Sequence, residues 1–161
     1  MGHWSEDIFG GDGGCDFFGN LCDKTGTQSL DYLIENLEIS DGYLDIEEAD
    51  AIIIISFIVI GFVNREYVKN SSKDVLNDYF KGKVEAYLDK NQELWLEKYE
   101  LGKYGPNHDL SIYQYCFNDI ERILDPKLSE AYELWAENQS AFSTWKSTRE
   151  GIQQEIKKLI K

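Results

Sequence analysis

The longest apolar run in the chain, AIIIISFIVIGFV from Ala51 to Val63, constrains the fold more than any other segment. It has 13 residues, whereas a membrane-spanning helix needs about 20 apolar ones. Acidic residues crowd the chain just before it, and Arg65 follows it. The run therefore predicts an element buried on all sides at the centre of a soluble core.

The same run leaves helix and strand open, because its many β-branched residues also suit a buried strand and periodicity cannot separate the two. The start signal favours a helix. Asp45 and Glu48 have the spacing of a capping box, and an acidic first turn suits the helix dipole. We therefore expect a helix over residues 46–63.

Apolar residues recur three and four positions apart through most of the remaining chain, as on the buried face of a helix. Ser71-Ser72 and Asp125-Pro126 are typical helix starts. Besides the central helix, the expected helices cover residues 13–23, 28–38, 73–89, a short piece at 94–99, 108–124, a segment after Asp125-Pro126, and 140–160. The sequence thus predicts an all-α fold, a compact single-domain bundle of about six to eight helices around the hydrophobic helix 46–63.

With 161 residues, the chain has the ordinary size of one domain, and we expect one helical domain over residues 1–161. Residues 1–11 are an aromatic, glycine-rich arm. Trp4, Ile8 and Phe9 are too apolar to remain in water, so the arm should be ordered against the body. Asp12 can then cap the helix at 13–23.

Charge is distributed unevenly along the chain, whose net charge is -14. Residues 1–60 hold 13 acids and one base, Lys24, while the other 101 residues hold 17 acids and 15 bases. Nucleic acid and anionic membrane are poor partners for such a surface, because both are bound through Lys and Arg. A basic protein would be steered towards it, although acidity that serves only solubility is the simpler explanation.

Asp41-Gly42-Tyr43-Leu44-Asp45-Ile46-Glu47-Glu48 resembles the second half of a calcium-binding EF-hand loop. The upstream half would place Leu37 and Ile39 where carboxylate ligands belong, and these side chains cannot bind a hard cation. A turn followed by a capping box is the favoured interpretation. We expect no metal, cofactor or catalytic residue.

The remaining chemistry-bearing residues form no motif. His3 and His108 are isolated, and the glycines at 10–14 follow no strand and precede no lysine. The three cysteines, an odd number without a CxxC, are predicted to be buried free thiols in a reducing compartment. Cys15 and Cys22 could share one helical face, with Cys22 facing inward. The N-terminus lacks the pattern of a signal peptide, so a cytoplasmic protein is expected.

Several short motifs resemble a largely bacterial family known as domain of unknown function 4259. They are the Met1-Gly2-His3-Trp4 start, the Asp41-Gly42-Tyr43-Leu44 turn before the central helix, and Glu133-Leu134-Trp135 followed by Trp145. The resemblance implies a compact helical fold and supplies no catalytic residues. Members often carry a glutamate in the central helix, whereas this chain has Ile54 to Ile58 there without an acid, so no role of that glutamate carries over.

The missing motifs and the concentrated negative charge favour a non-enzymatic acidic binding protein, in particular a bacterial immunity protein that neutralises a basic toxin such as a nuclease. The carboxylates expected to contact the partner are Glu35, Glu38, Asp41, Asp45, Glu47 and Glu48. Two alternatives stay open. A pocket that joins His108, a cysteine and a carboxylate would favour an enzyme. An apolar surface patch around Trp4 or Trp95 would favour a structural or regulatory subunit, including one of a homo-oligomer.

Overall fold

In the computed structural model, which describes residues 5–37, 42–99 and 110–160, the apolar run forms the central helix α3 (Ile46–Val63). Every residue of this helix from Ala49 to Phe62 is buried. Eight α-helices and one π-helical turn occupy the described residues, which confirms the predicted all-α fold. The other elements are α1 (Asp12–Cys22), α2 (Thr27–Glu35), α4 (Arg65–Lys69), α5 (Asp78–Leu94), η1 (Trp95–Tyr99), α6 (Ile112–Ile123), α7 (Glu130–Ala136) and α8 (Gln139–Lys157).

The capping box predicts the start of α3 correctly. The Asp45 side chain accepts a hydrogen bond of 2.8 Å from the Glu48 backbone N–H, which satisfies one of the free donors of the first turn. In the middle of the helix, the Ser56 hydroxyl donates to the carbonyl oxygen of Ile52 at 2.8 Å, so its burial leaves no unpaired donor. Because helices surround α3, β-branched residues fit on every side of it.

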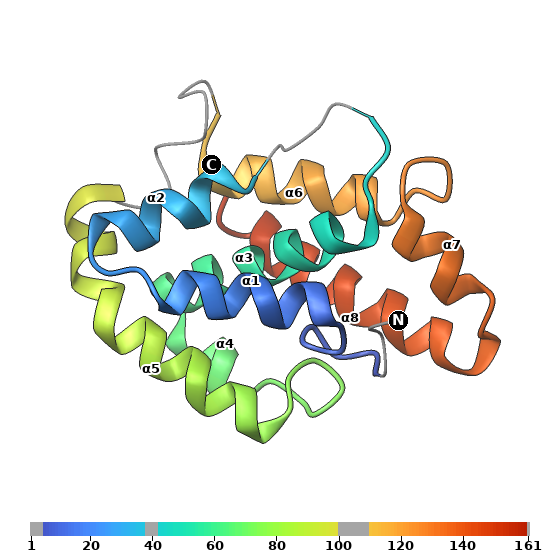
Figure 1. Cartoon of the computed structure of the whole chain (residues 1–161), viewed down its shortest axis with the longest axis horizontal. Helices are drawn as coiled ribbons and strands as arrows, with labels where there is room; N and C mark the ends of the chain where they lie inside the picture. Colours follow the sequence, from blue (N-terminus) through green and yellow to red (C-terminus); the bar gives the residue numbers. More distant parts are fainter. Residues whose placement is uncertain (1–4, 38–41, 100–109, 161) are drawn as a thin grey trace.

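Helices α1, α5, α6 and α8 pack against α3, and α1 crosses in front of it in Figure 1. Two glycines permit close approach. A Cβ atom on Gly14 in α1 would lie 2.9 Å from Ile54 Cδ1, and one on Gly61 in α3 would lie 2.6 Å from Leu88 Cδ1 of α5. The glycines at 10–14 thus include a packing position between helices.

The N-terminal arm packs against the body over the part that the structure describes. Ile8 and Phe9 are 1% exposed, and the Phe9 ring stacks on Phe80 with the ring centroids 4.2 Å apart. The Ile8 N–H donates to the Val75 carbonyl oxygen at 2.9 Å. Trp4, the third apolar residue of the predicted arm, lies outside the described residues.

A buried arginine fastens the arm to the last helix. Arg149 of α8 is 3% exposed, and its guanidinium donates to the carbonyl oxygens of Glu6 and Asp7. It lies 5.3 Å from the ring centroid of Trp145. Burial lowers the pKa of Arg149 to about 10, while the nearby carboxylate of Asp50 opposes that shift. Sequence patterns gave no sign of this arrangement, because Arg149 and Glu6 are far apart in the chain.

Several predicted helix boundaries are wrong because another residue provides the cap. The helix predicted at 73–89 begins at Asp78, where Asn77 accepts a hydrogen bond from the Phe80 N–H at 3.0 Å. Ser72 instead closes a turn. The short helix expected at 94–99 is η1, a π-helical continuation of α5.

Near the C-terminus, Asp125-Pro126 forms a turn, and α7 begins at Glu130 with Ser129 as its cap. At the other end of the chain, Asp12 is the first residue of α1 instead of its cap. The helix predicted at 108–124 begins at Ile112, and residue 108 lies outside the described part. Helix 28–38 ends at Glu35, and α4 was not predicted.

Candidate functional site

The structure places the predicted partner-binding carboxylates unequally. Asp45 and Glu47 are exposed and Glu48 is half-buried at the N-terminus of α3. Glu35 is exposed at the end of α2, and among the described residues no hydrogen bond or ion pair joins it to that group. The other two predicted contacts, Glu38 and Asp41, lie outside the described residues.

The fold adds three carboxylates that the sequence analysis missed. Glu130 and Glu133 of α7 come next to the N-terminus of α3, and Glu130 accepts a 3.2 Å hydrogen bond from the Ile46 N–H. Asp12 opens α1, whose Gly13 packs on the Glu47 side chain. We call this group the acidic end; it consists of Asp12, Asp45, Glu47, Glu48, Glu130 and Glu133.

A short backbone bridge holds α7 against the start of α3. The Leu44 N–H donates to the Leu128 carbonyl oxygen at 2.7 Å, and the Glu130 N–H donates to the Leu44 carbonyl oxygen at 3.0 Å. Beside the bridge, the Tyr43 hydroxyl donates to Glu133 Oε2 at 2.8 Å. Two residues of the motifs that carried the family resemblance, Tyr43 and Glu133, are therefore in contact.

The carboxylates of the acidic end crowd one another. Burial raises the pKa of Glu48 and the neighbouring charge of Asp45 raises it further, while the positive charge of Arg122 acts in the opposite direction. No lysine or arginine in the described part of the chain forms an ion pair with Asp12, Asp45 or Glu47. Their negative charge therefore remains available to a partner in solution.

The half EF-hand has a different role in the fold. Asp45 uses its carboxylate to cap α3, and Asp41 lies outside the described residues. Across residues 5–37, 42–99 and 110–160, no three His, Cys, Asp or Glu side chains gather as metal ligands. In the same residues, no helix is long and apolar enough to cross a membrane.

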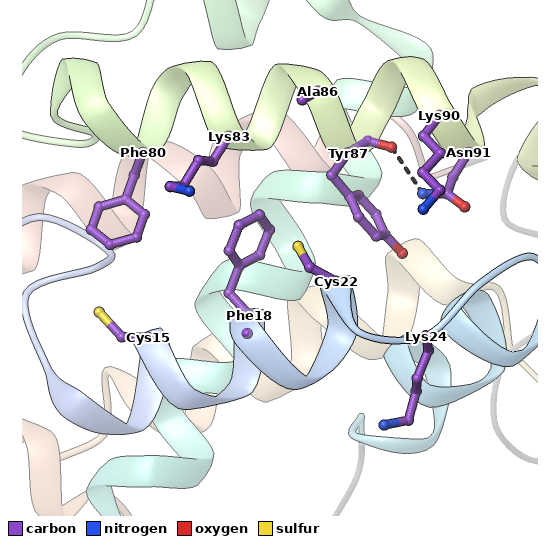
Figure 2. Close-up of a pocket in the computed structure, with 11 residues that line it drawn as sticks. Cys15, Phe18, Cys22, Lys24, Phe80, Lys83, Ala86, Tyr87, Lys90 and Asn91 are labelled. Atoms are coloured by element: carbon purple, nitrogen blue, oxygen red, sulfur yellow. Dashed lines mark hydrogen bonds between the residues drawn. The ribbon is translucent and has the colours of Figure 1, made fainter.

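A groove of about 420 Å³ runs between α1 and α5 (Figure 2). Phe18 and Tyr87 project into it from the two helices, and its exposed lining is mostly apolar. The complete lining consists of Cys15, Phe18, Gly19, Cys22, Lys24, Phe80, Lys83, Ala86, Tyr87, Lys90 and Asn91. No sequence signal identified this groove, because α1 and α5 contribute to it from distant parts of the chain.

Cys15 and Cys22 share one face of α1, as the spacing predicts, and both line the groove. All three cysteines are free thiols, but only Cys116 is fully buried. Cys22 is exposed, so the prediction that it faces inward is wrong; α1 ends there and the side chain opens onto the groove. Burial and the negative charge of Asp23 raise the pKa of Cys22, while Lys83 and Lys90 act in the opposite direction.

Two features bear on the alternative functions. The groove contains cysteines but neither histidine nor carboxylate in its lining, and His108 lies outside the described residues. Trp95 is fully buried, where it stacks on Phe62 with centroids 4.7 Å apart. It therefore anchors the core and exposes no apolar patch of its own.

No curated protein sequence and no solved structure matches this chain. The model of one protein family, described as domain of unknown function (DUF4259), matches residues 2–148. That match covers most of the 161 residues, including the arm, the central helix and the bridge between Leu44 and Ser129. The chain therefore belongs to the DUF4259 family.

Proposed function

We propose that this protein binds a basic protein partner through its acidic end, as an immunity protein of a bacterial toxin would. The observation that carries the proposal is the gathering of six carboxylates from α1, α3 and α7 at one end of the bundle. Several are exposed and close to one another, so they act together on a cationic surface. A partner such as a basic nuclease would be blocked without any chemistry in this chain.

Helix N-termini supply a competing reason for these acids. Asp12, Asp45, Glu47 and Glu48 lie in or beside first turns, where negative charge stabilises the helix by about 0.3–1 kcal/mol per residue. Glu130 and Glu133 likewise lie in the first turn of α7, although Glu133 also accepts a hydrogen bond across the bridge from the Tyr43 hydroxyl. The two explanations predict different results when the charges are reversed.

The decisive experiment compares two triple charge reversals of equal size. One replaces Asp12, Glu47 and Glu133 of the acidic end with lysine and leaves the Asp45 cap intact. The matched control replaces three exposed glutamates outside the acidic end with lysine: Glu93, Glu97 and Glu150. Each protein is immobilised and used to capture partners from the source cells, with elution from about 50 mM to about 500 mM salt, because salt screens exposed charges.

The expected result is a basic protein that wild type and control retain and the acidic-end variant loses, with affinity reduced at least about tenfold. If the captured protein is toxic when expressed alone, co-expression of wild type should restore growth and the acidic-end variant should not. Equal retention by both variants would contradict the proposal. In that case the acids serve helix stability and solubility alone.

A further inference from the structure

The groove between α1 and α5 is an exception to the charge of the molecule. The chain holds 30 acidic and 16 basic residues, yet the groove lining includes three lysines and no carboxylate. Its volume of about 420 Å³ is in the range of small-molecule sites, which hold about 300–1,000 Å³. We propose that this groove binds a small amphipathic anion, a free carboxylate with an unbranched apolar tail. This site is separate from the acidic end and does not depend on the function proposed for it.

The carboxylate head belongs at the end of the groove near Cys22. Lys83 and Lys90 stand seven residues apart on α5, and the Lys83 ammonium lies 5.0 Å from the ring centroid of Tyr79. The positive charges of both lysines act on the Cys22 thiol, against the negative charge of Asp23. Both lysines are exposed, so binding an anion there costs little desolvation. Lys24 is less suited, because it is directed away from the gap between the helices in Figure 2.

The tail belongs further along the groove, between aromatic side chains. Phe18 and Phe80 present their rings to it, and Tyr87 adds its apolar face. The Tyr87 hydroxyl is already engaged with the Ser29 hydroxyl at 2.8 Å, so this ring offers its apolar carbons. An acyl chain gains about 0.8 kcal/mol for each CH₂ group that it buries, which favours a long unbranched tail.

The two ends of the groove differ in electrostatics, and this difference fixes the orientation. At the Cys15 end, the carboxylates of Asp12 and Asp16 add to the effect of burial in raising the pKa of the Cys15 thiol. A second carboxylate would be repelled there. The head is therefore expected beside Cys22 and the tail directed towards Cys15.

The Cys22 thiol of α1 provides a direct readout of ligand binding in the groove. Decanoate is titrated at concentrations below micelle formation while the alkylation rate of Cys22 by iodoacetamide is followed by mass spectrometry. Cys116, which is fully buried, reports any general unfolding.

Decanol and decyltrimethylammonium carry the same tail with a neutral and a cationic head. Decanoate should protect Cys22 saturably, with about fivefold higher affinity than decanol, because two exposed ion pairs each contribute modestly. The cationic analogue should bind most weakly.

Two variants with matched controls separate head from tail. Replacing Lys83 and Lys90 with glutamine should weaken decanoate about fivefold and leave decanol unchanged. The control replaces Lys127 and Lys157, two exposed lysines that do not line the groove. Gly19→Leu should weaken both ligands, since a Cβ atom at Gly19 meets nothing within 4 Å and the larger side chain grows into the groove.

Gly82→Leu is the matched control for the tail, because Gly82 is also in open space on a helix but does not line the groove. Three outcomes would overturn the proposal. The first is the absence of saturable protection by decanoate in wild type. The second is equal affinity for decanoate and decanol, and the third is an equal loss in the lysine variant and its control, since in both cases the groove would not recognise the anionic head.

Discussion

Replacement of Arg149 with methionine tests whether the buried guanidinium fastens the N-terminal arm to the body. Methionine retains the apolar stem but removes the donors to the carbonyl oxygens of Glu6 and Asp7 and the positive charge beside Asp50. Breaking a buried charge pair by removing one member costs about 3–5 kcal/mol. For a domain of this size, that cost lowers the melting temperature by about 10 °C.

The assay is urea unfolding of Arg149→Met at neutral pH, combined with amide hydrogen exchange. The Ile8 N–H, which donates to Val75 at 2.9 Å, should lose protection once the arm is released. Amides in the middle of α3 should exchange more slowly than those of the arm, because local release precedes global unfolding. Arg149→Lys keeps the charge but cannot reach both carbonyl oxygens with a planar fork, and should cost about 1–2 kcal/mol.

Lys157→Met on the exposed face of the same helix is the control, with an expected change within about 0.5 kcal/mol. If Arg149→Met loses less than about 1 kcal/mol of unfolding free energy and the arm amides stay protected, the reasoning is refuted. The burial of Ile8 and Phe9 would then hold the arm without the arginine.

Two further predictions concern packing and pH. Gly61→Ala should destabilise the fold by about 1–3 kcal/mol in urea unfolding, because its Cβ atom would lie 2.6 Å from Leu88 Cδ1. Gly82→Ala, where the new Cβ atom meets open space, should instead stabilise the fold by about 0.5–1 kcal/mol. Similar effects at both sites would contradict this account. The free energy of unfolding should also fall as the pH rises from about 10 towards 12. Burial raises the pKa of several tyrosines above the value in the unfolded chain, so the folded state binds more protons than the unfolded state over this pH range. These tyrosines are Tyr67 and Tyr113, whose pKa values rise to about 12, and Tyr87. Arg149, with its lowered pKa, acts in the opposite direction but is a single group. Urea unfolding at several alkaline pH values, with tyrosinate absorbance, measures the effect, and a flat profile would contradict it.

The sequence predicts the helices that are decided by local residues. The capping box at Asp45 and the apolar run after it fix α3 because both signals lie within a few residues of the helix start. Boundaries fail where two caps compete. Asp125-Pro126 has the features of a helix start, but the backbone bridge to Leu44 takes up residues 128–130, and α7 begins after it.

The candidate sites depend more on long-range contacts. Charge asymmetry identifies the acids near Asp45, but Glu130 and Glu133 join them only because α7 packs beside the start of α3. The groove is less predictable still. Each of its lysines and cysteines looks ordinary in the sequence, and their common environment appears only when α1 and α5 lie side by side (Figure 2).

The fastening of the arm by Arg149 has a consequence for the order of events during synthesis on the ribosome. Glu6 and Asp7 leave the ribosome early, but the arginine that binds their carbonyl oxygens follows about 140 positions later. Until α8 emerges, the arm lacks this anchor and is held by earlier contacts alone, such as those of Phe9 with Phe18 and Phe80. Completion of the arm is therefore a late, long-range step, and a nascent chain stalled before residue 149 should bind chaperones through this segment.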